Sequence, residues 1–181
     1  ITGDAKFAAE PLEGLGGELR VTRDLLSRGN LNMAYSELFQ NYSREQVEDC
    51  IRLNLDIART DGMPIHIAET HDNNRLAARS PLFSRLRTAL CALSSTHGAF
   101  GFANGVEWYA TEKIDVHEAR SLRWGAHPNQ VAHLARLNAI LAAHPAFHHH
   151  AEISLVTQGP GTAIALFRIH PPSGRRVLIL I

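Results

Sequence analysis

The apolar residues change spacing repeatedly between residues 6 and 147, from short continuous runs to the three- or four-residue spacing of a helix. Short runs that end in glycine, proline or asparagine predict buried strands, and the wider spacing predicts amphipathic helices. The predicted strands are 6–9, 32–39, 65–68 and 98–102, and the predicted helices are 18–29, 43–61, 80–93 and 129–143. This alternation predicts four βα units around a parallel sheet.

Two of the predicted helices have clear start signals. Ser43 with Gln46 three residues later is a capping box, and Ser80 places an N-cap residue before a proline at the first helical position. Helical spacing predicts one apolar face on each of the last two helices, formed by Leu82, Leu86, Leu90 and Leu93 in one and by Val131, Leu134, Leu137 and Leu141 in the other. Residues 106–127 lack a period, and a connection of this length is typical of a functional loop.

After residue 147 the chain changes to β-branched, alternating runs over 152–157, 163–170 and 176–181. These predict antiparallel strands of a separate all-β module. We therefore expect residues 1–147 to form the C-terminal half of a (β/α)8 barrel and residues 148–181 to begin a C-terminal β domain. Half a barrel leaves strand edges uncovered, so we expect either a missing N-terminal half or self-association through those edges.

Composition and charge narrow the class of partner. Eighteen basic residues balance eighteen acidic ones in 181 residues, which does not favour nucleic acid or an anionic membrane surface, so a neutral ligand is expected. No apolar stretch approaches the roughly 18 residues of a membrane span. Cys50 and Cys91 fall in predicted helices, where thiols are usually small buried hydrophobes, so we expect no disulfide framework, a reducing compartment and a cytoplasmic protein.

The most informative segment is the apolar run 65–68, which ends abruptly in the polar cluster Glu69-Thr70-His71-Asp72-Asn73-Asn74-Arg75. Burying such side chains without partners is costly, so the cluster predicts an exposed strand end. The carboxyl ends of parallel strands are where α/β enzymes place their chemistry.

These residues resemble the C-terminal half of the α-amylase family, glycoside hydrolase family 13. The resemblance rests on Phe7-Ala8-Ala9-Glu10 at one strand end, Thr70-His71-Asp72 two units later, and the run from Gly98 to Glu107 at the next, which contains a Gly-x-Glu turn. It extends over nearly the whole chain. The sequence around 35–45 is most similar to the maltosyltransferase branch, which extends α-1,4-glucans.

The resemblance implies a retaining mechanism on an α-glucan or malto-oligosaccharide. We expect no cofactor and no metal ion. Glu10 would be the general acid/base, while Asp72 and His71 would bind the reacting sugar. Thr70 stands where the family has asparagine. The family's nucleophile, an aspartate on an earlier strand, has no counterpart here, so this chain alone is expected to be inactive. Further sugar contacts are expected from Glu37, Asn74 and Trp108.

Each residue also has a plainer interpretation. Glu10 could be a solvated loop acid, His71 and Asp72 could stabilise a turn, and Glu69 and Arg75 could form an ordinary ion pair. The aromatic side chains of Trp108, Tyr109 and Trp124 could be sugar-stacking platforms or buried loop anchors. Three adjacent histidines at 148–150 point alternately to opposite sides of an extended segment and do not predict a zinc site.

Two other classes remain as alternatives to a glycosidase. One is a non-catalytic carbohydrate-binding or scaffolding module with a barrel-like rim. The other is an unrelated α/β hydrolase or metal enzyme, which would need a nucleophile-elbow motif or metal-ligand spacing that we do not find in the sequence.

Overall fold

The computed structural model describes residues 11–12, 19–29, 31–36, 38, 41–157 and 161–181. Four parallel strands, β1 (Pro11–Leu12), β2 (Met33–Ser36), β3 (Met63–Ile67) and β4 (Phe100–Gly101), form one sheet in the order β1-β2-β3-β4. Strand order equal to chain order is the arrangement expected of consecutive βα units in a barrel wall. The predicted parallel α/β architecture is therefore confirmed.

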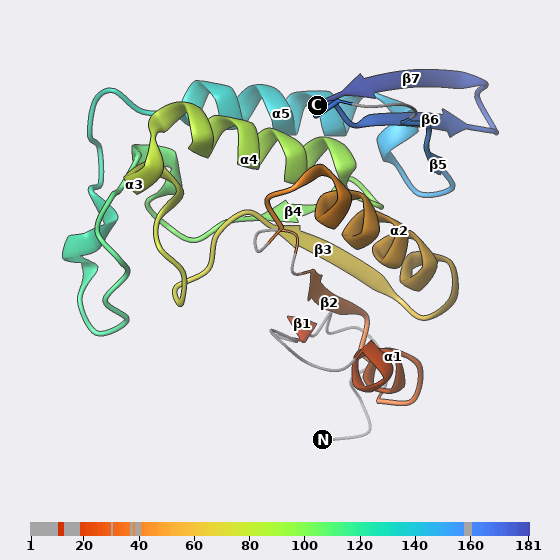
Figure 1. The fold of residues 1–181 in the computed structure, drawn as a ribbon, viewed down its shortest axis with the longest axis horizontal. Helices are drawn as coiled ribbons and strands as arrows, with labels where there is room; N and C mark the ends of the chain where they lie inside the picture. Colours follow the sequence, from red (N-terminus) through yellow and green to blue (C-terminus); the bar gives the residue numbers. More distant parts are fainter. Residues whose placement is uncertain (1–10, 13–18, 30, 37, 39–40, 158–160) are drawn as a thin grey trace.

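The helices are α1 (Leu19–Ser27), α2 (Arg44–Thr60), α3 (Leu76–Arg79), α4 (Pro81–Ser94) and α5 (Val131–Ala143), with short 3-10 turns η2 (Val106–Trp108), η3 (Ala119–Leu122) and η4 (Pro145–Phe147). Figure 1 shows α4 and α5 as a layer beside the sheet, with α2 along β3. The predicted capping box of Ser43 and Gln46 is present with both hydrogen bonds, and Ser80 caps α4 by accepting from the Phe83 N–H at 3.0 Å. Both helix starts were thus correctly predicted.

The two faces of the sheet differ in burial. Ala34, Ser36 and His66 are buried, whereas Tyr35 and Ile65, which are register partners on β2 and β3, are only partly covered. Side chains alternate between the faces of a strand, so the partly covered residues share the face opposite the buried ones. The face that carries Tyr35 and Ile65 is therefore the more open face of the sheet.

The first and last strands differ from their predictions. The predicted strand 6–9 lies outside the described residues, and Pro11–Leu12, just after it, pair with Met33 and Ala34. Strand pairing is thus found beyond residue 9, where the predicted strand ended, so the predicted end is wrong. Strand β4 is shorter than the predicted 98–102, although single hydrogen bonds from Ala68 to Gly101 and from Ala103 to Glu69 continue its pairing with the end of β3.

The predicted inner face of α4 is partly wrong. Leu82 and Leu86 are 65% and 54% exposed, while Ser84, Arg87, Thr88 and Cys91 are buried. These polar side chains tolerate burial because they are hydrogen bonded: Gln130 donates to Ser84 Oγ at 2.8 Å, and Arg87 donates to the carbonyl of Leu38.

Helix α5 is closer to its prediction. Leu134, Leu137 and Leu141 are buried as expected, but Val131 is 41% exposed. Val131 is the first residue of the helix, so no preceding helical turn lies beside its side chain.

The predicted antiparallel strands after residue 147 are confirmed as β5 (Glu152–Leu155), β6 (Ala165–His170) and β7 (Arg175–Leu180). Leu166 and Ile179 share one hydrophobic core with Leu137 and Phe147. The buried Arg168 guanidinium donates to the carbonyls of Ala146, Leu93 and Ser95 at 2.7–3.0 Å. This sheet is thus packed onto the helical layer, and the domain boundary at residue 147 remains a prediction.

Two further sequence observations have a structural counterpart. Cys50 and Cys91 are both reduced thiols, and burial raises the pKa of the Cys91 thiol to about 12. Among the described helices, none combines the length and the apolar character needed to cross a bilayer.

Candidate functional site

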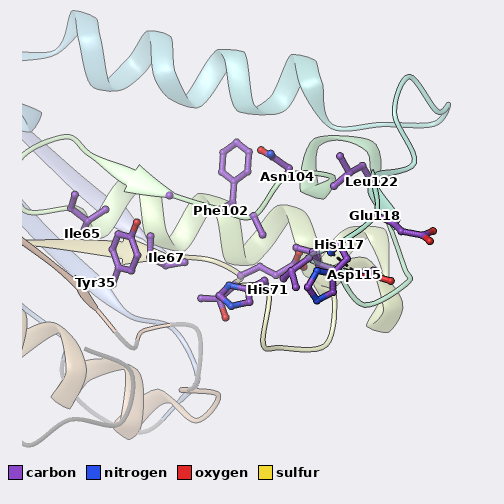
Figure 2. A pocket seen from close by; sticks show the side chains of 16 residues that line it. Tyr35, Ile65, Ile67, His71, Phe102, Asn104, Asp115, His117, Glu118 and Leu122 are labelled. Atoms are coloured by element: carbon purple, nitrogen blue, oxygen red, sulfur yellow. Dashed lines mark hydrogen bonds between the residues drawn. The ribbon is translucent and has the colours of Figure 1, made fainter. Parts of the chain in front are cut away.

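A cavity of about 610 Å³ opens where β2, β3 and β4 end (Figure 2). Its floor is apolar and comes from the open face of the sheet, with Tyr35, Ile65, Ile67 and Phe102. Its polar rim comes from two loops, and the rim residues are Glu69, Thr70, His71, Asn104, Asp115, His117 and Glu118. The described lining contains no lysine or arginine, so it offers hydrogen bonds and negative charge but no counterion for an anionic ligand.

The loop after β3 is held in a tight turn. Thr70 Oγ1 donates to Asn73 Oδ1 at 2.5 Å and accepts from the Asp72 N–H at 3.3 Å. His71 and Asp72 remain exposed, with His71 Nε2 3.6 Å from Asp72 Oδ2. Thr70 therefore makes the turn-stabilising contacts, which leaves the His71 and Asp72 side chains available to a ligand. Of these three residues, Thr70 and His71 line the cavity, and Asp72 is adjacent to them.

Beneath this loop, Glu69 and Arg75 form an ion pair with both side chains buried. Arg75 Nη1 donates to Glu69 Oε1 at 2.6 Å, and the Leu76 N–H donates to Glu69 Oε2 at 2.6 Å. Burial raises the pKa of Glu69, while the bond from Leu76 and the charge of Arg75 act in the opposite direction. The predicted pair is present, but it is an internal structural element rather than an exposed contact.

Arg75 also connects the loops on either side of the cavity. Its Nη2 donates to the carbonyl of Asn104 at 2.8 Å and is 3.5 Å from the carbonyl of Ser121. Gly105 makes this approach possible, because a Cβ there would lie 2.0 Å from Arg75 Nη2. Gly105 has φ +98°, and its N–H donates to Glu107 Oε2 at 2.9 Å, closing the predicted Gly-x-Glu turn.

The second side of the cavity is formed by residues 114–118 and Leu122, which the sequence did not identify individually. The only signal was the aperiodic segment 106–127, which was predicted to be functional as a whole. Asp115 and His117 come from this segment, and Figure 2 shows them at the same end of the cavity as His71.

The structure does not place Glu10, Glu37 and Asn74 in the lining of this cavity as it is described. Glu10 and Glu37 lie outside the described residues. Asn74 lines another cavity, of about 400 Å³, together with Tyr42, Arg79 and Phe83. The structure thus brings Thr70 and His71 together in the large cavity and places Asn74 elsewhere.

The tryptophans are paired away from the cavity lining. The Trp108 ring lies 5.6 Å from that of Trp124, centroid to centroid, and Trp108 Nε1 is buried without a described partner. Trp124 is 77% exposed. Trp108 is thus a half-buried anchor beneath an exposed ring, and Tyr109 is buried as a loop anchor.

The histidines at 148–150 do not form a metal centre with other described residues. His148 Nε2 is 2.9 Å from the carbonyl of Ala142, and the His149 and His150 rings are 4.0 Å apart. In the part of the chain that the structure describes, no group of three or more histidine, cysteine or acidic residues could hold a metal ion.

Comparison with known proteins supports the fold. No protein-family model and no curated protein sequence matches the chain. Three solved structures share its fold: an isomaltulose synthase mutant from Erwinia rhapontici NX5 in complex with D-glucose (TM-score 0.69, 14% identity, 96% of this chain), isomaltulose synthase from Klebsiella sp. LX3 (0.64, 12%, 91%) and a MutB mutant in complex with glucose (0.66, 13%, 91%). The chain spans 45–46% of the length of these proteins. It therefore has the fold of slightly less than half of an isomaltulose synthase chain.

Proposed function

We propose that this chain is the C-terminal half of the catalytic barrel of a retaining α-glucan-acting enzyme of the α-amylase family, together with the start of its β domain. One observation carries the proposal: the cavity at the strand ends is lined by Thr70 and His71 of the motif that suggested the family. An apolar aromatic floor with a polar rim suits a sugar, whose ring has apolar faces and a periphery of hydroxyl groups. The absence of basic residues from the described lining favours a neutral ligand over a phosphorylated one.

The mechanism assigned to the complete protein is double displacement. Glu10 protonates the glycosidic oxygen while a carboxylate from the missing half attacks C1, and Glu10 then removes a proton from water or an acceptor sugar. Asp72 and His71 hold the hydroxyls of the same sugar and bind it more tightly as the ring flattens. Hydrolysis and transfer share the first step, so these residues serve either outcome.

The test is turnover by the longer protein that includes the upstream strands. Glu10→Gln should reduce kcat on malto-oligosaccharides by about 10²–10⁴-fold, the usual contribution of general acid/base catalysis. Glu13→Gln is the matched control, because Glu13 is the next carboxylate along the chain, and it should leave kcat nearly unchanged. A loss confined to Glu13→Gln would move the acid/base role to Glu13.

Two further results would change the proposal. The 181-residue chain should not turn over starch or maltosyl substrates, and retaining hydrolysis by a verified preparation of it would refute these roles. A longer protein that binds α-glucans without cleaving or transferring them would instead be a carbohydrate-binding module.

The branch of the family is a separate part of the proposal. The segment around residues 35–45 favours transfer of maltosyl units, whereas two of the three solved structures are isomaltulose synthases. Fold similarity at 12–14% identity does not discriminate between the two reactions. Product analysis of the longer protein, for lengthened glucan or for isomaltulose, decides the question. We place the enzyme in the cytoplasm, on the argument from its two thiols.

A further inference from the structure

We propose that His117 is a second sugar-binding residue, which hydrogen-bonds the same pyranose ring as His71 and favours a ring over an open-chain polyol. This inference rests on the proposed function and names a contact in its substrate site. It starts from the cavity, whose described lining holds two imidazoles from separate loops: His71 follows β3, and His117 lies between η2 and η3.

A chain of hydrogen bonds fixes the loop that carries His117. Arg75, buried against Glu69, approaches the carbonyl of Ser121 at 3.5 Å. Ser121 Oγ accepts from the Asp115 N–H at 3.2 Å, and Asp115 Oδ1 accepts from the His117 N–H at 2.9 Å. The loop is therefore connected to the same buried pair that underlies His71, so the two imidazoles share one support.

The orientation of the side chains favours one shared ligand. Figure 2 shows the His71 and His117 rings at one end of the cavity, Asp115 beside His117, and Tyr35 with Ile67 at the other end. The Glu118 carboxylate points away from His71 in the same view. A ring placed against the aromatic floor would present its hydroxyls to the two imidazoles.

The chemistry of the groups restricts the ligand class. A neutral imidazole donates one hydrogen bond and accepts another, which matches adjacent hydroxyls that also do both. A phosphorylated sugar would meet the exposed acids Asp115 and Glu118 without a basic residue in the described lining. A metal ion is disfavoured because no described group of histidine and acidic residues could hold one. A neutral pyranose is the ligand that fits these groups.

The experiment follows the histidine ring signals of the 181-residue chain by NMR during titration with maltose, since all described walls of the cavity belong to this chain. The signals of both His71 and His117 should shift on one common binding curve. His170, at the end of β6, is an internal control and should not shift. Sorbitol, an acyclic polyol, and glucose 6-phosphate should give much weaker shifts at equal concentration.

Variants complete the test. His117→Ala should weaken maltose binding about tenfold, as expected for the loss of one good ligand hydrogen bond, and His170→Ala should leave it unchanged. His117 is exposed, so its replacement should not disturb folding. A shift of His71 without His117, or unchanged affinity in His117→Ala, would overturn this inference and leave the proposed function standing. If maltose moves neither ring, this inference fails, and turnover by the longer protein decides the proposed function separately.

Discussion

Replacing Arg75 by methionine tests whether the buried Glu69–Arg75 pair holds the rim of the cavity. Methionine keeps much of the length of the side chain but leaves the Glu69 carboxylate buried and unpaired. The Glu69 and Arg75 side chains are 1% and 0% exposed, so water cannot replace the lost partner. Removing one member of a buried pair costs ~3–5 kcal/mol, a large part of the roughly 5–15 kcal/mol stability of a typical domain.

The matched control is an exposed pair of similar length. Arg52 Nη1 lies 2.8 Å from Asp49 Oδ1, and these side chains are 56% and 77% exposed. Asp49→Asn should therefore cost only ~0–1 kcal/mol. Urea unfolding followed by circular dichroism measures both variants, with an unchanged slope required for the comparison. If Arg75→Met loses no more stability than Asp49→Asn, the argument from burial is refuted.

The pH dependence supplies a second readout for Arg75→Met. Without Arg75, the folded-state pKa of Glu69 should lie further above its ordinary value of 4.5, because burial raises it and the compensating charge has gone. A carboxyl group with a raised folded pKa binds more protons in the folded state, so lowering the pH favours folding. The deficit of the variant relative to the natural sequence should thus shrink as the pH falls towards 4.5. A deficit that is constant from pH 7 to pH 4.5 would mean that the unpaired carboxylate is not its cause.

Two other predictions follow from the same structure. Burial lowers the pKa of His66 from 6.5 to about 4, so the unfolding free energy should fall by ~3 kcal/mol as the pH drops from 6.5 towards 4. In urea titrations, His66→Gln should lose that part of the pH dependence. Parallel pH profiles of the variant and the natural sequence would contradict this. Gly105→Ala should destabilise the chain by well over ~1 kcal/mol, the cost expected for Gly125→Ala. Both glycines have positive φ, but only at Gly105 would the added Cβ lie within 4 Å of Arg75. Equal melting temperatures of the two variants would contradict this.

The sequence predicted the elements whose signals are local. The capping box at Ser43 and the Ser80-Pro81 start were correct because each motif satisfies its own helix end through neighbouring residues. The apolar run before Glu69 similarly predicted a strand end with a polar cluster, and β3 ends at Ile67. Local chemistry and tertiary structure agree at these positions.

Errors arose where tertiary hydrogen bonds decided burial. Leu82 and Leu86 followed the helical period that predicted the inner face of α4, yet Ser84 and Arg87 are the buried residues. Their partners, Gln130 and the carbonyl of Leu38, lie more than 40 residues away in the sequence. A pattern of apolar positions carries no information about such partners. The same reason explains why residues 114–118 were predicted only as part of an aperiodic loop.

One group of buried polar side chains surrounds the cavity. The buried polar side chains of Glu69, Arg75, Ser121 and Gln130 belong to or connect the loops around the cavity, while others, such as Arg87 and Arg168, join helices and strands. Hydrogen bonds are directional, so they fix loop positions that nondirectional apolar packing would leave less defined. A sugar site needs such fixed positions because its specificity depends on hydroxyl geometry. The rim should consequently lose sugar affinity before the sheet loses its fold when this network is weakened.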